Sequence, residues 1–475
     1  MQTDCTPRQL EFQGWGAGRR RRVVADFEGG TLTSDGGVLL LGEVERRRQV
    51  VRRFAACFRD HREPSAIEHG VEELLAQRVF GLALGYEDLN DHEELRVDPL
   101  LATVIGKADP TGTKRRRERD RGKPLAGKST LHRLEGSIAA DPSRDRYKRI
   151  EVDSEAVDRF FVEVFLDSFE EAPQRIVLDL DATDDPVHGA QEGRFFHGYY
   201  GCYCYLPLYV FCGQHLLCAR LRRSNIDASE GAVEEMERIV GQIRERFPEV
   251  EIWLRADSGF AREELMAWCE TNGVGFCLGL ARNARLERAL AEALEEAERR
   301  YQSSQRPERL YEELTYRTRQ SWSRKRRVVG KAEFLAKGRN PRFVVTSLSR
   351  RQVSAAELYE QIYCARGDME NRIKEQQLDL FADRTSAHLM RVNQLRLWYS
   401  SVAYVLLAEL RRLGLAGTDL ARAQCNTIRL KLLKIGARIR ITVRRVWVSL
   451  SSAYPHQRLF AEILENLQAV RGSPS

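Results

Sequence analysis

The sequence lacks any long apolar segment. No stretch of about 18 or more uncharged apolar residues occurs in the 475-residue chain, and a helix needs about 20 such residues to cross a bilayer. The N-terminal segment MQTDCTPRQLEFQGW also lacks the basic and then apolar order of a signal peptide. We therefore expect no membrane partner and a cytoplasmic location.

Cysteine is sparse and scattered. The 475 residues include ten cysteines, several of them in apolar runs, which is typical of reduced, buried thiols. The densest group is Cys202, Cys204, Cys212 and Cys218, but its C-x-C pair and the following gaps of seven and five residues do not match zinc-finger spacing. A structural zinc protein is therefore a minor alternative that metal analysis would settle.

Acidic residues are absent from a long C-terminal segment. Residues 420–461 contain nine Lys or Arg and no Asp or Glu, and further basic clusters lie at 19–22 and 114–123. The net charge is only +7, so the distribution is more informative than the total. Clustered cations indicate a polyanionic partner, although each cluster taken singly is better explained as a solvated face or loop.

Periodicity divides the chain into five regions. A mainly helical region is expected over 1–150. Residues 171–282 follow the order three strands, helix, strand, helix, strand, which predicts an α/β fold with helices covering a mixed sheet. Residues 283–350 indicate a charged helix and antiparallel strands, and we expect an inserted β-rich subdomain there. Helices over 351–415 would complete the α/β domain, and 416–475 form a basic C-terminal region.

Three acidic residues occupy positions that suit a metal site. Asp181 ends the first strand of the α/β region, Asp257 follows a later strand, and Glu370 lies on a late helix. Strand ends are where α/β sheets build sites, and converging carboxylates are good ligands for Mg²⁺. Each also has a structural alternative, because Asp257 suits a turn and Glu370 could pair with Lys374. Asp179 shares the strand face of Asp181, and its role stays open.

Three motifs carry a resemblance to a known family. DATDDPVHG, LRADSGF and YCARGDMENRIKE occur in this order and resemble the motifs of DDE transposases of bacterial insertion sequences. The last fits the Tyr-x2-Arg-x3-Glu signature. With LTSDGGVLLLGEVERR and GYEDLNDHEELRVDPL near the N-terminus, the chain is similar to the insertion-sequence-1380 family over most of its length. The resemblance implies a bacterial, nucleoid-associated protein with an RNase H-like catalytic domain.

The same resemblance implies the roles of the late helix. Asp181, Asp257 and Glu370 would be the catalytic acids and would hold two Mg²⁺ or Mn²⁺ ions. Tyr363 and Arg366 match the Tyr and Arg of the signature, and the relatives often have a Lys seven residues after the Glu. Here that position is Gln377, so Lys374, one turn earlier on the same helix, is expected to take its place. Tyr363, Arg366 and Lys374 would then hold phosphate oxygens of DNA.

The β-rich insertion has an expected DNA contact of its own. In related transposases a subdomain at this place contacts the transposon end. Trp322 is flanked by cations, and our hypothesis is that it stacks on a displaced base, with Arg324, Lys325 and Arg326 beside it, although the pattern favours the following alternative. The alternative is a buried tryptophan that anchors a small sheet.

The implied function is cut-and-paste transposition of double-stranded DNA. The enzyme would bind terminal inverted repeats, cleave a strand and use the freed 3′-hydroxyl to attack target DNA. Two ends must meet, so a homodimer is expected, with 1–150 and the basic tail supplying sequence reading and dimer contacts. The alternatives are an RNase H-fold DNA nuclease that cuts without joining, and a catalytically inactive DNA-binding relative.

Overall fold

The computed structural model describes residues 10–12, 23–136 and 150–470 and divides into two compact units. The first unit combines residues 1–49, 64–132 and 409–475, and the second combines 50–63 and 133–408. The basic cluster at 19–22 lies outside the described residues. The helical N-terminal region and the basic C-terminal region, which the sequence separates, therefore contribute to one unit.

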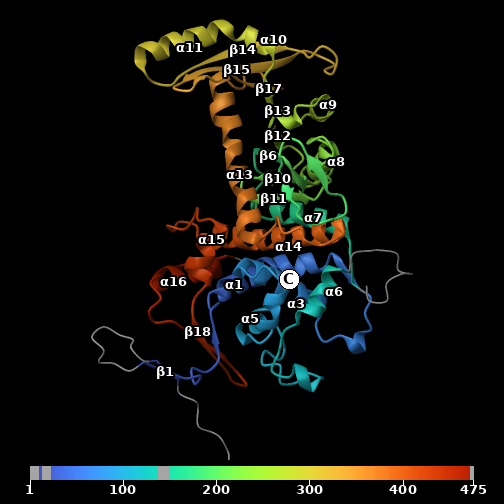
Figure 1. The fold of residues 1–475 in the computed structure, drawn as a ribbon, viewed down its shortest axis with the longest axis vertical. Helices are drawn as coiled ribbons and strands as arrows, with labels where there is room; N and C mark the ends of the chain where they lie inside the picture. Colours follow the sequence, from blue (N-terminus) through green and yellow to red (C-terminus); the bar gives the residue numbers. More distant parts are fainter. Residues whose placement is uncertain (1–9, 13–22, 137–149, 471–475) are drawn as a thin grey trace, which may run out of the picture. The chain divides into compact units, whose positions relative to one another are not determined.

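A nine-stranded mixed sheet forms the centre of the second unit (Figure 1). β6, β12 and β13 are parallel neighbours, the β10–β11 hairpin extends one side, and antiparallel β17, β15 and β14 extend the other. This confirms the predicted mixed sheet. Its strands are β6 Arg175–Ala182, β10 Leu208–Cys212, β11 His215–Arg220, β12 Glu251–Ala256, β13 Gly275–Leu280, β14 Glu308–Tyr316, β15 Arg326–Leu335, β16 Gly338–Arg339 and β17 Arg342–Thr346.

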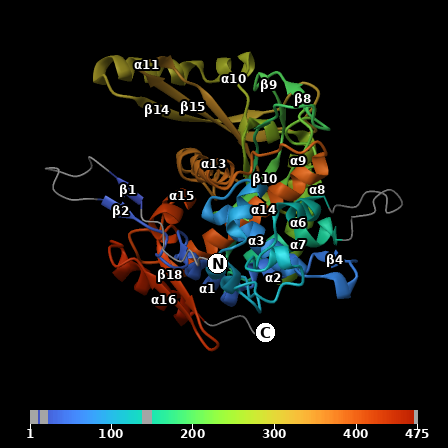
Figure 2. The ribbon, with the colours of Figure 1, turned by 60° about the horizontal axis from the view of Figure 1, so that its bottom comes forward.

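The strands of 283–350 belong to this same sheet. The sequence predicts a subdomain with its own strands, but β17 pairs with β13, so the antiparallel strands continue the central sheet. The charged segment before them forms α10 Ala284–Ala289 and α11 Ala291–Ser304, which lie over β14 and β15 (Figure 2). Hydrogen bonding between β13 and β17 makes the insertion an extension of the α/β layer.

Helices cover both faces of the sheet. On one face, apolar residues of β6 such as Ile176, Leu178 and Leu180 pack under α7 Ser154–Leu166, α8 Ala232–Arg246 and α9 Glu263–Thr271. Side chains alternate along a strand, so Asp179 and Asp181 point to the opposite face. That face is covered by the helical segment that contains α13 Gly367–Lys374, seen on the other side of the strands in Figure 1.

This helical segment runs from Ala355 to Asp379 and is irregular. It starts with α12 Ala355–Glu357, where the Ser354 hydroxyl accepts a hydrogen bond from the Glu357 amide at 3.3 Å. Wider, π-type turns occur over Leu358–Tyr363 and Glu375–Asp379, with a tighter 3-10 turn over Cys364–Arg366. Such turns change the direction of side chains and are frequent at functional sites.

Shorter elements complete the second unit. β7 Asp185–Pro186, β8 Phe195–His197 and β9 Cys202–Tyr205 form a small antiparallel sheet. α2 Val50–Ala55 precedes β4 Phe58–Asp60, which pairs with β5 Ile150–Val152. α14 Met390–Glu409 contacts the β10–β11 hairpin, where the Tyr404 hydroxyl donates to the Gln214 carbonyl at 2.9 Å. Within the described segments, no helix combines the length and apolarity that a membrane crossing requires.

In the first unit, a small sheet pairs a strand from the N-terminal part of the chain with strands from the C-terminal part. β18 Ala437–Ile441 pairs with β19 Val446–Leu450 and with β3 Leu32–Thr33. A Cβ atom on Gly37 would lie 1.8 Å from the Leu432 carbonyl oxygen, so this close approach requires glycine. The helices of this unit are α1 Val38–Arg48, α3 Val71–Leu84, α4 His92–Leu95, α5 Pro99–Val104, α6 Lys128–Glu135, α15 Cys425–Ile428 and α16 Gln457–Ala469, and β1 Leu10–Phe12 pairs with β2 Val23–Ala25.

Candidate active site

Two of the predicted acids lie at the same edge of the sheet. β6 and β12 are parallel neighbours, and their register pairs Leu180 with Ala256. The next residues along the two strands are Asp181 and Asp257, so adjacency follows from the register alone. An Asp257 carboxylate oxygen also accepts a hydrogen bond from the Gly259 amide at 2.8 Å. Asp257 therefore forms the turn after β12, as the structural alternative predicts, and also faces the cleft.

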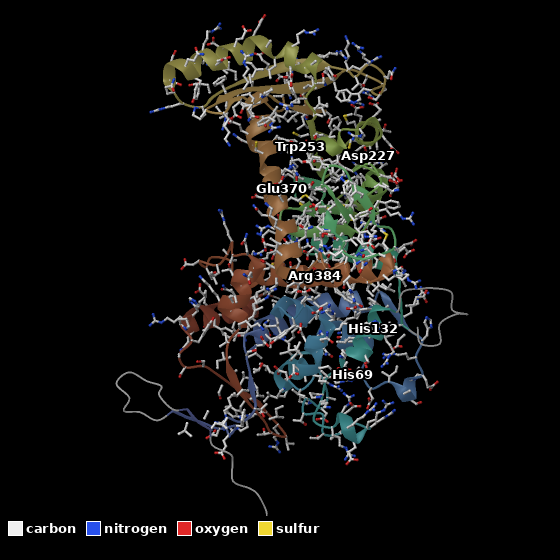
Figure 3. The ribbon with its side chains drawn as sticks, viewed as in Figure 1. His69, His132, Asp227, Trp253, Glu370 and Arg384 are labelled. Carbon is white, nitrogen blue, oxygen red and sulfur yellow. The ribbon has the colours of Figure 1, made fainter. Side chains whose placement is uncertain are left out.

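Glu370 reaches this edge from α13 (Figure 3). Arg366 lies one turn earlier, and its guanidinium contacts both Asp181, at 3.3 Å, and Glu370, at 2.6 Å. Glu370 therefore pairs with Arg366 rather than with Lys374. The guanidinium bridges two carboxylates from distant parts of the chain and provides the positive charge between them.

The three acids line one cleft of about 750 Å³. Burial raises the pKa of Asp181 to about 7; Arg366 opposes the rise, while the charges of Asp257 and Glu370 add to it. Arg366 and Lys374 line the same cleft, so it combines hard oxygen donors with cations.

The donor set suits a divalent cation, although the side chains are not yet arranged around one. Among the described residues, no three His, Cys, Asp or Glu side chains are gathered closely enough to hold a metal ion. Arg366 occupies the position between Asp181 and Glu370 that a shared cation would need. Carboxylate oxygens are hard donors of the kind that Mg²⁺ and Mn²⁺ prefer, so the chemistry of the residues fits these ions.

Tyr363 lies beside the turn that carries Asp257. A Cβ atom on Gly279 of β13 would be 2.6 Å from the Tyr363 hydroxyl and 2.9 Å from the Ser258 backbone nitrogen. The Tyr363 ring packs on Tyr359 with centroids 5.6 Å apart, and burial raises the pKa of Tyr363. Tyr363 therefore holds a fixed position beside the Asp257 turn. It lines a neighbouring pocket with Ser258 and Gly279 rather than the acid cleft, so its predicted contact with phosphate stays a prediction.

Comparison with protein families matches residues 16–472 to the family described as Transposase DDE domain group 1. The chain belongs to this family. The expectation of a DDE transposase is thus confirmed at the family level, and with it DNA binding and transposition as the kind of function. Membership of the insertion-sequence-1380 branch stays a prediction.

This DDE transposase is similar to a piggyBac transposase synaptic complex with hairpin DNA determined by cryo-EM, with 10% sequence identity, 93% of this chain and 87% of that chain covered, and a TM-score of 0.38. A TM-score of that size does not establish a common fold. No curated protein matches the chain.

Gly279 of the transposase gives a sharp test of the site geometry. Gly279→Ala would place a methyl group against Tyr363 and the backbone at Ser258, displacing the Asp257 turn. Because misplacement by about 1 Å can cost about 100-fold in rate, we expect DNA cleavage to fall by up to about that factor. Gly241→Ala on α8 is the control, since its Cβ would meet nothing within 4 Å. Unchanged cleavage by folded Gly279→Ala would contradict the described packing.

Arg255 is a site-supporting residue that the sequence analysis missed. Its guanidinium forms two hydrogen bonds of 2.6 Å to the carboxylate of Asp179, its cross-strand neighbour, and a third of 2.8 Å to the Ile362 carbonyl. Both carboxylate oxygens of Asp179 are therefore engaged by Arg255, and Asp179 is not available as a metal ligand. Through Ile362, the pair fixes the turn that precedes Tyr363 and Arg366.

Gln377, at the position of the signature lysine, forms hydrogen bonds to residues of the protein itself. Its amide nitrogen donates to the Asp185 carboxylate at 2.9 Å and to the Asp184 carbonyl at 3.1 Å. Asp185 is fully buried, which raises its pKa to about 8, while the hydrogen bond from Gln377 opposes the rise. Lys374 lines the cleft and is exposed, with no ion-pair partner among the described residues. Its predicted role as the phosphate-binding cation is compatible with this placement.

The structure contradicts the base-stacking hypothesis for Trp322 and agrees with the alternative of a buried anchor. Trp322 is only 4% exposed, packs edge-on against Tyr316 and lies under Arg326. Arg326 is itself buried and paired with Glu263 and Glu270. The tryptophan is therefore the buried anchor of the alternative interpretation and offers no face to a base. Of the predicted insertion contacts, only Arg324 and Lys325 are exposed.

The cysteine group does not form a zinc site. Cys202 and Cys204 lie on β9 of the small sheet, while Cys212 and Cys218 lie on β10 and β11 of the central sheet. Burial raises the pKa of the Cys204 and Cys212 thiols to about 12, which favours the protonated form. The four cysteines are divided between two sheets, and among the described residues no group of three or more His, Cys, Asp or Glu is gathered around a possible metal position.

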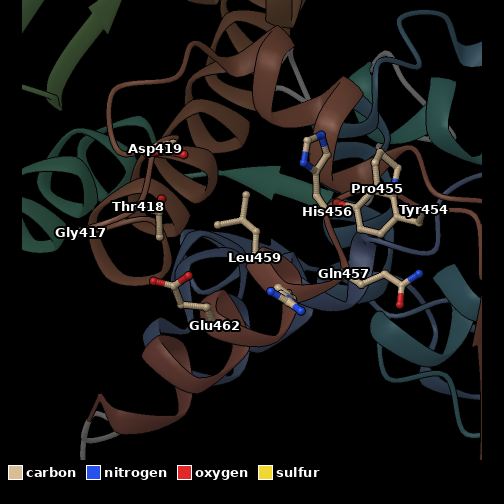
Figure 4. Close-up of a pocket in the computed structure, with 10 residues that line it drawn as sticks. Gly417, Thr418, Asp419, Tyr454, Pro455, His456, Gln457, Leu459 and Glu462 are labelled. Atoms are coloured by element: carbon tan, nitrogen blue, oxygen red, sulfur yellow. The ribbon is translucent and has the colours of Figure 1, made fainter.

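A second pocket, of about 580 Å³, lies in the first unit. It is lined by residues 417–419, residues 454–459 and Glu462. Figure 4 shows Asp419 and Glu462 on one side of Leu459 and His456 on the other. None of the site residues predicted from the sequence lines this pocket.

Proposed function

We propose that this transposase cleaves and joins DNA strands at the cleft that contains Asp181, Asp257 and Glu370. The observation that carries the proposal is that acids from β6, from the turn after β12 and from α13 line one cleft together with Arg366. Family membership supports transposition as the outcome. The strand order β11-β10-β6-β12-β13 supports an RNase H-like domain, and the sequence motifs support a bacterial insertion sequence as the source.

The acidic residues of the cleft would bind metal ions, and its basic residues would bind phosphate oxygens. Asp181, Asp257 and Glu370 would hold two Mg²⁺ or Mn²⁺ ions, whose chemistry would be to lower the pKa of an attacking oxygen nucleophile and to stabilise charge on a leaving oxygen. If cations replace its contacts with Asp181 and Glu370, the planar guanidinium of Arg366 would be able to bind phosphate oxygens, and Lys374 would present a single mobile charge. Hydrolysis by water and attack by a 3′-hydroxyl are both in-line displacements, so one site can serve both steps.

The β18–β19 hairpin is our candidate for a second DNA contact. Arg438, Arg440, Arg444 and Arg445 are exposed, and none forms an ion pair with a described residue. The Trp447 ring, also exposed, has the guanidinium groups of Arg440 and Arg445 at 5.5 and 5.7 Å from its centroid. Unpaired arginines on a projecting ribbon suit the phosphate backbone.

The hairpin contact predicts a change in salt dependence. Removing two phosphate contacts with Arg440→Ala/Arg445→Ala should weaken DNA binding and lower the slope of log affinity against log salt by about 2. Fluorescence anisotropy with duplex DNA at several salt concentrations measures this slope. The control is Arg46→Ala/Arg159→Ala, which removes the same charge from exposed arginines that pair with Glu43 and Glu155. Equal slopes for the two double variants would exclude the hairpin contact.

The reaction itself is tested with the DNA that flanks the gene. Labelled ends are incubated with the full chain and Mg²⁺ or Mn²⁺, with a plasmid as target. Cut ends joined to the plasmid support transposition, whereas cut ends that never join would indicate a nuclease. Binding without metal-dependent cutting would indicate an inactive relative. The mass of the DNA complex then tests the proposed homodimer, which would hold two ends.

A further inference from the structure

The β8–β9 hairpin exposes a cluster of aromatic side chains. Tyr199 is 86% exposed, Phe196 58%, Tyr203 49% and Phe195 38%. Aromatic rings bury large areas when they have a partner, so several exposed rings within nine residues indicate a binding surface. We define these four residues as the aromatic patch.

The rings of the patch are held by a fixed backbone. The Ser224 hydroxyl donates to the Phe195 carbonyl at 2.9 Å, and the Val187 amide donates to the Tyr203 carbonyl at 2.8 Å. Phe196 and Tyr203 pack edge-to-face with centroids 5.6 Å apart, and the Arg194 guanidinium lies 4.7 Å from the Tyr203 centroid. The rings of Phe196 and Tyr203 are thus positioned in advance of any ligand.

The patch is continuous with the acid cleft. Tyr199 and Tyr200 line the cleft together with the three acids. The rings of these two tyrosines are 5.0 Å apart, and the Tyr200 hydroxyl donates to the Ala182 carbonyl at 3.3 Å, directly after Asp181. A strand whose phosphate lies at Asp181 would therefore bring its neighbouring nucleotide to Tyr199.

We propose that the aromatic patch binds an unpaired base of the DNA strand next to the phosphate that is cut. This rests on the proposed function, because it uses the phosphate position in the acid cleft. Planar rings stack on bases of any sequence, and the cations of the cleft attract the backbone of the same strand. A base within a duplex is covered by its neighbours, so the ligand is an unpaired nucleotide.

The test compares two DNA duplexes in the presence of EDTA, so that no cutting is required. One duplex is blunt, and the other has a short single-stranded overhang that carries a fluorescent adenine analogue. The full-length parent should prefer the overhang DNA and quench the analogue on binding. Tyr199→Ala and Phe196→Ala should reduce this preference by about tenfold and weaken the quenching. Their affinity for blunt DNA should remain within about twofold of the parent, whereas Tyr199→Trp should retain the preference.

The control is Phe27→Ala, which removes an aromatic ring that is 91% exposed in the first unit. An unchanged overhang preference in Tyr199→Ala and Phe196→Ala would overturn the base-binding patch while leaving cleavage at the acid cleft intact. Loss of dimer mass in these variants with unchanged DNA preference would overturn it in favour of a contact between two copies of the chain. No DNA binding by the parent would overturn both proposals.

Discussion

Glu370→Gln is expected to abolish metal-dependent cleavage of the DNA ends while DNA binding persists. The substitution keeps the shape of the side chain and removes the charge that a divalent cation needs. Loss of a group that only orients a metal ligand typically costs about 10- to 100-fold, so loss of a ligand itself should exceed about 100-fold. Asp257→Asn should behave alike. Single-turnover cleavage of labelled ends in Mg²⁺ measures the effect.

Asp368→Asn is the matched control for this prediction. Asp368 lies on the same helix as Glu370, is exposed and does not line the acid cleft. It should cut the DNA ends at the rate of the parent. If Glu370→Gln cuts as fast as Asp368→Asn, Glu370 holds no catalytic metal and the assignment of the cleft is wrong.

The second large effect is on stability, at the pair of Asp179 and Arg255. Both side chains are nearly buried, and the pair shares two short hydrogen bonds. Arg255→Met would leave the Asp179 carboxylate buried without its partner, which typically costs about 3–5 kcal/mol. We expect that loss in the free energy of unfolding, measured by urea titration. Asp179→Leu/Arg255→Met should be less destabilised than Arg255→Met, because no charge is left unpaired.

The same two strands offer an exposed pair as a control. Arg175 and Glu251 are also cross-strand neighbours on β6 and β12, and they form an ion pair of 2.7 Å with both side chains more than 40% exposed. Exposed pairs contribute about 0–1 kcal/mol, so Arg175→Met should have a small effect. Similar losses in the free energy of unfolding for Arg255→Met and Arg175→Met would mean that burial does not determine how much Arg255 contributes to stability.

Arg255 was predictable in part. It interrupts an apolar strand one position from Ala256, and Asp179 similarly interrupts β6. Opposite charges inside two adjacent buried strands suggest a pair, but only the register of β6 and β12 places them side by side. The contact of Arg255 with the Ile362 carbonyl joins residues 107 positions apart, and no local pattern encodes it.

Trp322 and Tyr199 show that local sequence composition is a poor guide to the exposure of a side chain. Trp322 lies among cations in QSWSRKRR, whereas the patch lies in FFHGYYGCYCY, which has the composition of a core strand. In the structure the tryptophan is buried and the patch is exposed. Composition describes the neighbours in sequence, but burial depends on which elements pack against the side chain.

By itself, the sequence determined the order of strands and helices in the α/β region, the position of Asp181 and Asp257 at strand ends, and the placing of Arg366, Glu370 and Lys374 on one side of the late helix. These depend on strand alternation, helix periodicity and turn residues, which act over a few positions. Only the tertiary structure decided that Arg366 bridges Asp181 and Glu370, that the strands of 283–350 extend the central sheet, and that β18 pairs with β3. Each depends on contacts between residues far apart in the chain, where packing and the pairing of buried groups select the partner.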